Sequence, residues 1–75
     1  MATVTLDTKG MNSPIPILKA RKSIKGMAAG ETLEVLSTDP GSVRDFEAFC
    51  RATGNPLLES SEEDGGVFCY VIEKA

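Results

Sequence analysis

The segment Ser13-Pro14-Ile15-Pro16 contains the residues with the clearest potential for chemistry. A pattern of hydrophobic residues typical of a helix follows it. Proline at the first helical position costs no hydrogen bond, because the first four N–H groups of a helix have no internal partner. We therefore predict that Pro14 is the first helical residue, that Pro16 stiffens the first turn, and that Ser13 is the N-cap. A rigid helix start is by itself a sufficient explanation of this segment.

An N-cap side chain also experiences the positive end of the helix dipole, which amounts to about half an elementary charge. A cysteine in that place would have a lowered thiol pKa and could hold a persulfide. A serine hydroxyl gains too little from the same field to ionise at neutral pH. Position 13 is thus suited to sulfur, whereas Ser13 carries oxygen.

The rest of the chain predicts one domain over residues 1–75, with four strands and two helices. Alternating or β-branched segments predict strands at 2–6, 31–37, 56–60 and 67–73, with a loop at 7–12 and a hairpin turn at 64–66. The first helix is expected over 14–28 and to stop at Gly30. The second is expected to start with a capping box formed by Ser42 and Asp45, and to end at Gly54.

Each predicted helix has a single apolar stripe, so both helices should cover one face of the sheet. The predicted fold is an α/β (α+β) two-layer sandwich, βαβαββ, with two helices packed on one face of a four-stranded mixed sheet. In the last strand, Phe68, Tyr70 and Ile72 should face the helices. The stripes are Ile17, Ala20, Ile24, Met27 and Ala28 in the first helix, and Val43, Phe46, Phe49, Cys50 and Thr53 in the second.

Composition disfavours several classes of function. With a net charge of −3, no tryptophan and one tyrosine, the chain is not expected to bind nucleic acid directly and specifically. Without histidine and with only two cysteines, no metal site is expected. The chain shows neither a signal peptide nor a membrane-spanning segment, which suggests the cytoplasm. Cys50 is interpreted as a small buried hydrophobic residue, and Cys69 as partly exposed on the other face of the sheet.

The sequence resembles the TusA family of sulfur carriers, also called SirA-like, whose motif is Cys-Pro-x-Pro at the start of the first helix. The resemblance extends over nearly the whole chain. It includes the Leu-Asp…Gly-Met loop before the motif, a Gly-Glu-x-Leu segment and an Asp-Pro-x-x-x-x-Asp segment. These segments are Leu6-Asp7-Thr8-Lys9-Gly10-Met11, Gly30-Glu31-Thr32-Leu33, Asp39-Pro40 with Arg44-Asp45-Phe46, Phe49-Cys50, Gly54-Asn55 and Tyr70-Val71-Ile72-Glu73-Lys74.

The resemblance implies a sulfur relay without a cofactor. The motif cysteine takes sulfur as a persulfide from a cysteine desulfurase or a rhodanese, and passes it to an acceptor protein for tRNA thiolation, cofactor assembly or sulfur oxidation. Ser13 occupies that position and cannot form a persulfide, so the chain as written should be inactive as a carrier. Either Ser13 is an engineered replacement of a cysteine, which the intact prolines favour, or the chain is a natural paralogue that has lost the thiol and serves as a binding or regulatory module.

Some charged residues have both an ordinary and a functional interpretation. A basic group on the first helix is either a solvated helix face or a surface that docks an acidic partner or RNA that the partner carries. Asp39 is either part of a turn or takes part in sulfur transfer. The free chain is expected to be a monomer, and Gly10 is expected to shape the loop before the motif. The basic group consists of Lys19, Arg21, Lys22 and Lys25.

Overall fold

The computed structural model describes residues 3–75, and its elements follow the order β-α-β-α-β-β. This order confirms the predicted βαβαββ arrangement. Residue Ala2, where the first strand was predicted to begin, lies outside the described residues. The elements are β1 (Thr3–Thr8), α1 (Ile15–Lys25), β2 (Thr32–Ser37), α2 (Ser42–Thr53), β3 (Leu57–Glu63) and β4 (Val67–Glu73).

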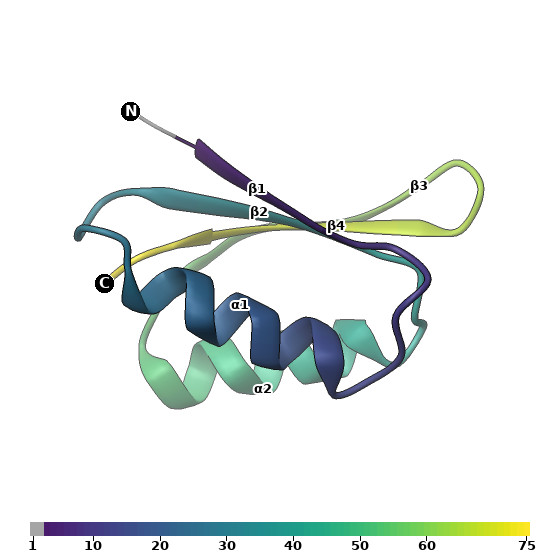
Figure 1. The fold of residues 1–75 in the computed structure, drawn as a ribbon, viewed down its shortest axis with the longest axis horizontal. Coiled ribbons are helices and arrows are strands. Elements are labelled where there is room, and N and C mark those ends of the chain that lie inside the picture. Colours follow the sequence, from purple (N-terminus) through teal and green to yellow (C-terminus); the bar gives the residue numbers. More distant parts are fainter. Residues whose placement is uncertain (1–2) are drawn as a thin grey trace.

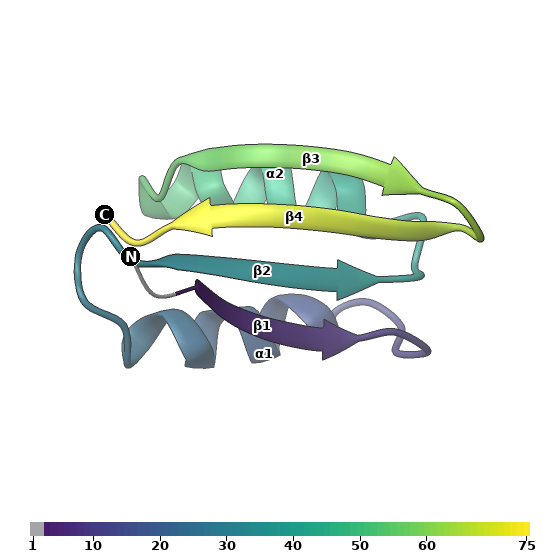
Figure 2. The ribbon, with the colours of Figure 1, turned by 90° about the horizontal axis from the view of Figure 1, so that it is seen from above.

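The four strands form one mixed sheet in the order β1-β2-β4-β3 (Figure 2). β1 and β2 are parallel, and β4 is antiparallel to both of its neighbours. Both helices pack on the same face of the sheet (Figure 1), which confirms the predicted two-layer sandwich. Parallel neighbours need a long crossover connection, and α1 provides the one between β1 and β2. Neither helix in residues 3–75 has the length and apolar character needed to cross a bilayer.

The core lies between the sheet and the helices. Alternation along β2 directs Leu33 and Val35 inward, and Tyr70 and Ile72 on β4 pair with them in register. Both predicted helix stripes contribute to the core, but Ala28 of the first and Thr53 of the second are exposed. The buried hydrophobic residues of the core are Ala20, Ile24, Leu33, Val35, Phe46, Phe49, Cys50, Tyr70 and Ile72.

Tyr70 has a polar partner inside this core. Its ring stacks on Phe46, with centroids 4.6 Å apart. Its hydroxyl is hydrogen-bonded to the hydroxyl of Ser42 at 2.7 Å, and both residues are buried. Ser42 is the first residue of α2 and is not its cap, because no side-chain hydrogen bond caps this helix. The predicted capping box is therefore wrong. The Ser42 hydroxyl is instead the hydrogen-bond partner of the Tyr70 hydroxyl, because a buried hydroxyl without a partner lowers stability.

α1 ends earlier than the sequence predicts. It ends at Lys25 and not at Ala28, because Gly26 follows and takes a non-helical conformation. Glycine weakens a helix by roughly 1 kcal/mol relative to alanine. Gly30, the predicted stop, lies in the following loop, where its N–H donates to the carbonyl of Lys74 at 2.9 Å.

Two strands are longer than predicted because their partners hold them. β1 continues from Leu6 through Thr8, which is opposite Ser37 of β2, so the predicted loop begins two residues later. The Thr8 hydroxyl also donates to the carbonyl of Leu36 at 2.6 Å. β3 begins one residue later than predicted and continues to Glu63, which pairs with β4. The ends of β1 and β3 are thus determined by pairing with neighbouring strands, which the pattern within one strand does not predict.

The Ser42–Tyr70 hydrogen bond predicts a specific loss of stability. We expect Tyr70→Phe to lower the free energy of unfolding by about 1–2 kcal/mol, because the Ser42 hydroxyl is then buried without a partner. Urea unfolding followed by circular dichroism measures this change. Adding Ser42→Ala to Tyr70→Phe should recover part of the loss. Equal stability of the Tyr70→Phe variant and the parent chain would contradict the role of the pair.

Candidate functional site

The candidate site lies at the edge of the sheet where β1 and β2 end. Because these strands are parallel, their carboxyl ends meet at the same edge. The loops at 9–14 and 38–41 leave this edge and lead into α1 and α2, so both helices begin on the same side of the molecule (Figure 1). Binding sites of open α/β sheets commonly lie outside the carboxyl ends of strands. The crossover thus brings position 13 next to Asp39, which lies 26 residues further along the chain.

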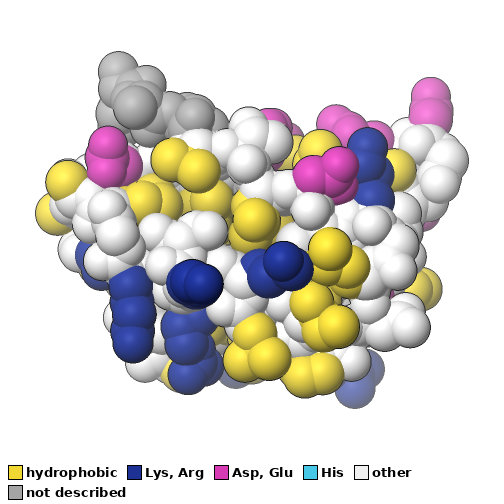
Figure 3. Space-filling view, in the orientation of Figure 1, with side chains coloured by type: hydrophobic (Ala, Val, Ile, Leu, Met, Phe, Trp, Pro, Cys, Tyr) yellow, Lys and Arg dark blue, Asp and Glu magenta, His cyan; other side chains and the backbone are white. Residues whose placement is uncertain are grey.

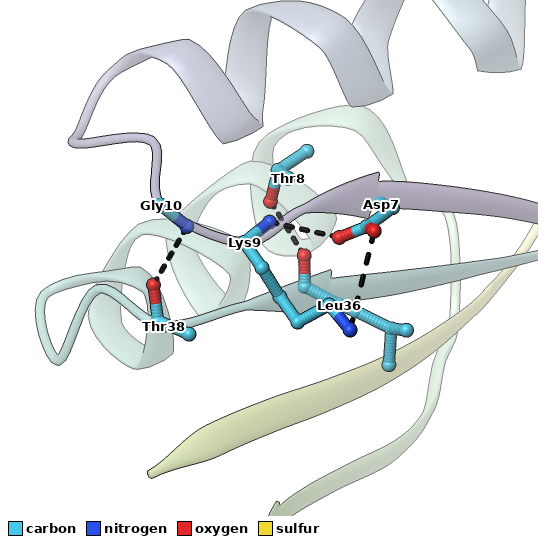
Figure 4. A network of polar contacts seen from close by, with 6 residues as sticks. All are labelled: Asp7, Thr8, Lys9, Gly10, Leu36 and Thr38. Carbon is cyan, nitrogen blue, oxygen red and sulfur yellow. Dashed lines mark hydrogen bonds and ion pairs between the residues drawn. The ribbon is translucent and has the colours of Figure 1, made fainter.

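The loop before position 13 is attached to the loop before α2 (Figure 4). The N–H of Gly10 donates to the hydroxyl of Thr38 at 2.9 Å. The N–H of Lys9 donates to the Asp7 carboxylate at 3.0 Å, which closes the turn. Gly10 has a φ of 82°, a left-handed conformation that glycine adopts without strain. These contacts determine where the chain enters α1.

Ser13 is not the N-cap of α1. The helix begins at Ile15, Pro14 is its N-cap, and no side-chain hydrogen bond caps it, so the predicted cap and first helical residue are wrong. The peptide bond before Pro14 is cis. Pro16 lies in the first turn and is buried. Ser13 itself is exposed.

Ser13 is hydrogen-bonded to two carboxylates from the α2 side. Its N–H donates to Asp39 Oδ2 at 2.7 Å, and its hydroxyl donates to Asp45 Oδ2 at 2.6 Å. The other oxygen of Asp39 accepts the N–H of Gly41 at 3.0 Å, so Asp39 also closes the turn before α2. Position 13 is therefore held by the beginning of α2, although it precedes α1 in sequence.

Opposing electrostatic contributions meet at position 13. The N-terminal ends of α1 and α2 each carry about half a positive charge. The carboxylates of Asp39 and Asp45 bring negative charge within hydrogen-bond distance. The expectation of an electropositive environment is therefore incomplete. The arrangement accepts a proton-bearing group at position 13 more readily than a bare anion.

Position 13 lies between two surface depressions, and Ser13 and Asp45 line both. One is a groove of about 320 Å³ between the helices, with Ile17 and Phe49 among its lining residues. The other is a more polar hollow of about 570 Å³ beside the start of α2, where Asp39 contributes. A partner that contacts residue 13 can thus use an apolar surface on one side and a charged surface on the other.

The four predicted basic residues all lie on α1 and are exposed. They do not share one environment. Arg21 lines the groove that contains Ser13, and its guanidinium carbon lies 5.7 Å from the centroid of the Phe49 ring, a cation–π geometry. The other three are Lys19, Lys22 and Lys25. No group of three or more histidine, cysteine or acidic side chains within residues 3–75 is arranged to hold a metal ion.

The two cysteines are buried and their thiols are poorly acidic. Cys50 lies in the core, as predicted, and burial raises the pKa of its thiol. Cys69 is only 4% exposed, so the expectation of partial exposure is wrong. Burial, and then the charge of the neighbouring Glu34 carboxylate, raise the pKa of the Cys69 thiol to about 11. At neutral pH both thiols are protonated and shielded, which makes them weak nucleophiles.

These environments predict the reactivity of both thiols. We expect iodoacetamide at about pH 8 to leave Cys50 and Cys69 unmodified in the folded chain and to modify both in urea. Alkylation of Cys69 should rise about tenfold per pH unit until the pH nears 11. Peptide mass spectrometry after timed quenching measures both rates. Rapid modification of Cys69 in the folded chain at neutral pH would show that the thiol is accessible and ionised.

Asp45 is the residue of the site that sequence reasoning missed. Its position three residues after Ser42 suggested a capping box, but no side chain caps α2. The available signal was the Asp-Pro-x-x-x-x-Asp segment, in which Asp39 and Asp45 recur together. A spacing of six residues places the first carboxylate before the helix and the second in its first turns. Only the fold shows that both reach residue 13.

The chain is similar to known proteins in both sequence and fold. The sequence profile of a family described as Sulfurtransferase TusA matches residues 4–74. The chain is 53% identical over 70 residues to the sulfur carrier protein TusA of Allochromatium vinosum, covering 93% of this chain and 91% of that protein. It is 51% identical over 73 residues to a putative sulfur carrier protein of Neisseria meningitidis serogroup A, covering 97% of each. The crystal structure of a SirA-like protein from Desulfitobacterium hafniense matches with a TM-score of 0.84 and 28% identity, covering 93% of this chain and 95% of that one.

Proposed function

The chain belongs to the TusA family of sulfurtransferases, and from this premise we propose that residue 13 is the position through which its scaffold relays sulfur between proteins. The observation that carries the proposal is the placement of Ser13. It is exposed, lies two residues before α1, and lines two depressions that a partner protein can enter. Neither buried cysteine offers a comparable position.

The relay consists of two exchanges at a cysteine in position 13. Its thiolate attacks the terminal sulfur of a persulfide on the donor, a cysteine desulfurase or a rhodanese. The new S–S bond forms as the donor's S–S bond breaks, and the donor cysteine leaves as a thiolate that takes up a proton. An acceptor protein of tRNA thiolation or sulfur oxidation then receives the sulfur in the same way. The sulfur stays covalently bound throughout, so the relay needs no cofactor, and we assign it to the cytoplasm with a carrier that is monomeric when free.

A serine at position 13 stops this chemistry, because its hydroxyl does not ionise at neutral pH. We propose that Ser13 replaces a cysteine in an otherwise intact carrier. The proline pair supports this proposal, since Pro14 and Pro16 remain where the carrier motif has them. The chain as written then binds the same partners without taking their sulfur.

A second candidate is a protein-binding or regulatory module in which Ser13 is native. The hydrogen bond from the Ser13 hydroxyl to Asp45, at 2.6 Å, favours it, because the serine is well accommodated where it stands. The codon for residue 13 in the source gene separates the two candidates. A cysteine codon supports the carrier, and a serine codon supports the module.

Restoring the thiol tests the carrier. We expect the Ser13→Cys variant, incubated with a cysteine desulfurase, cysteine and pyridoxal phosphate, to gain one sulfur atom on the peptide that contains residue 13. The unaltered chain is the control and should gain none, because both of its cysteines are buried. Intact-mass and peptide mass spectrometry measure the gain. Sulfur found only on Cys50 or Cys69 would disprove the assignment of position 13.

We further propose that the exposed face of α1 docks the sulfur donor. Basic and hydrophobic side chains gather over this helix, whereas acidic ones lie along the sheet side (Figure 3). Leu18 is 56% exposed and Ile15 is 43% exposed, so large apolar side chains lie beside the basic ones on this face. An acidic partner surface with an apolar centre would complement this face. Its basic members are Lys19, Arg21, Lys22 and Lys25.

Reversing charge on this face tests the docking surface. We expect Lys19→Glu combined with Lys22→Glu to lower the association rate with the desulfurase several-fold, and more so at low salt, because complementary charges steer encounter. Arg51→Glu is the control, compared with Lys22→Glu alone, since it makes the same change of charge on α2 and not on the exposed face of α1. Stopped-flow binding measures the rates. Unchanged rates and salt dependence in the double variant would refute the docking surface.

A further inference from the structure

Asp45 is the carboxylate closest to the side chain that would carry sulfur. Its Oδ2 lies 2.6 Å from the hydroxyl oxygen of Ser13, and it lines both the groove and the hollow. No lysine or arginine nitrogen within residues 3–75 lies in ion-pair distance of it, since Lys9 with Asp7 is the ion pair found there. The negative charge of Asp45 therefore acts directly on residue 13.

The second carboxylate of the site acts differently. Asp39 accepts the N–H groups of Ser13 and Gly41, so two backbone donors partly balance its charge. It holds the main chain of residue 13, whereas Asp45 holds the side chain. The remaining charged groups are further from the contact. They are Arg44 and Glu47, which line the hollow, and Arg21, which lines the groove.

We propose that Asp45 is the positioning residue of the sulfur-accepting position: its carboxylate directs the side chain of residue 13 between the groove and the hollow and keeps a thiol there protonated in the free protein. This inference rests on the proposed function, because it concerns a cysteine at position 13. A carboxylate at this distance accepts a hydrogen bond from S–H and repels a thiolate. It thus opposes the N-terminal ends of the helices, which favour the thiolate.

The consequence is a carrier that is selective. A freely ionised thiol on an exposed loop would react with any electrophile or disulfide that it met. A thiol held by Asp45 stays mostly unreactive, and a donor that contacts the hollow beside Asp45 can change this environment as it docks. The same contact explains why Ser13 is tolerated, since a hydroxyl donates the hydrogen bond without the ionisation.

The test compares variants of the full chain that carry Ser13→Cys. Asp45→Asn removes the charge and retains a carbonyl oxygen that can accept a hydrogen bond. Glu47→Gln is the matched control, because it removes one negative charge from the same helix and the same hollow without a hydrogen bond to residue 13. Asp45→Glu retains the charge. The readout is the rate at which iodoacetamide alkylates the residue-13 peptide from about pH 5 to pH 10, which yields the thiol pKa.

We expect Asp45→Asn to lower the pKa of that thiol by about one unit, which makes alkylation at neutral pH about tenfold faster. Glu47→Gln should lower it by less than half as much, and Asp45→Glu should leave it close to that of the Ser13→Cys parent. Urea unfolding of each variant establishes that it is folded at the assay temperature. Equal thiol pKa values with Asp45→Asn and Glu47→Gln, or a higher value with Asp45→Asn, would overturn the proposal.

Sulfur loading separates this inference from the function on which it rests. The alkylation measurement uses no donor protein, so it reports on Asp45 even when no relay exists. Failure of the Ser13→Cys variant to accept sulfur from a desulfurase, together with the expected fall in thiol pKa, would remove the relay and leave the Asp45 contact established. Normal loading with an unchanged thiol pKa would remove the role of Asp45 and leave the relay.

Discussion

The parallel pairing of β1 with β2 is the constraint on which the site depends. It brings the carboxyl ends of two strands to one edge of the sheet, and the loops that follow must therefore begin side by side. The hydrogen bond between Gly10 and Thr38 joins those loops. Without this pairing, residue 13 and the carboxylates around α2 would have no reason to meet, since they are separated along the chain by a complete helix and a strand.

The same arrangement explains how a small core supports an exposed functional residue. The Phe46 ring and the Ser42 hydroxyl both contact Tyr70 of β4, so the first turns of α2 are anchored to the centre of the sheet. Asp45 lies in this anchored part of the helix and extends the other way, to residue 13. Residue 13, although exposed, is thereby held by a helix that is anchored in the core.

A hydroxyl and a thiol at position 13 differ in how readily each would ionise there. Ser13 donates one hydrogen bond to Asp45 and remains neutral. A thiol in the same place balances the positive ends of two helices against a nearby carboxylate, so its ionisation depends on small changes in either. Membership of a sulfurtransferase family and the presence of serine are thus compatible with one scaffold.

The sequence by itself determined the order of the elements and most of the residues that face the core, but not where each helix and strand ends. Alternation in β2 and β4 and the helical stripes of α1 and α2 specify the two layers, because burial of apolar side chains follows their period along the chain. The Cys-Pro-x-Pro-like segment also marked residue 13. The sequence did not predict the contacts of residue 13. Ser13 and Ser42 were each interpreted as a helix cap, because capping is a local pattern. In the tertiary structure the Ser13 hydroxyl is hydrogen-bonded to Asp45 and the Ser42 hydroxyl to Tyr70. These partners are distant in sequence and become available only after the chain has folded.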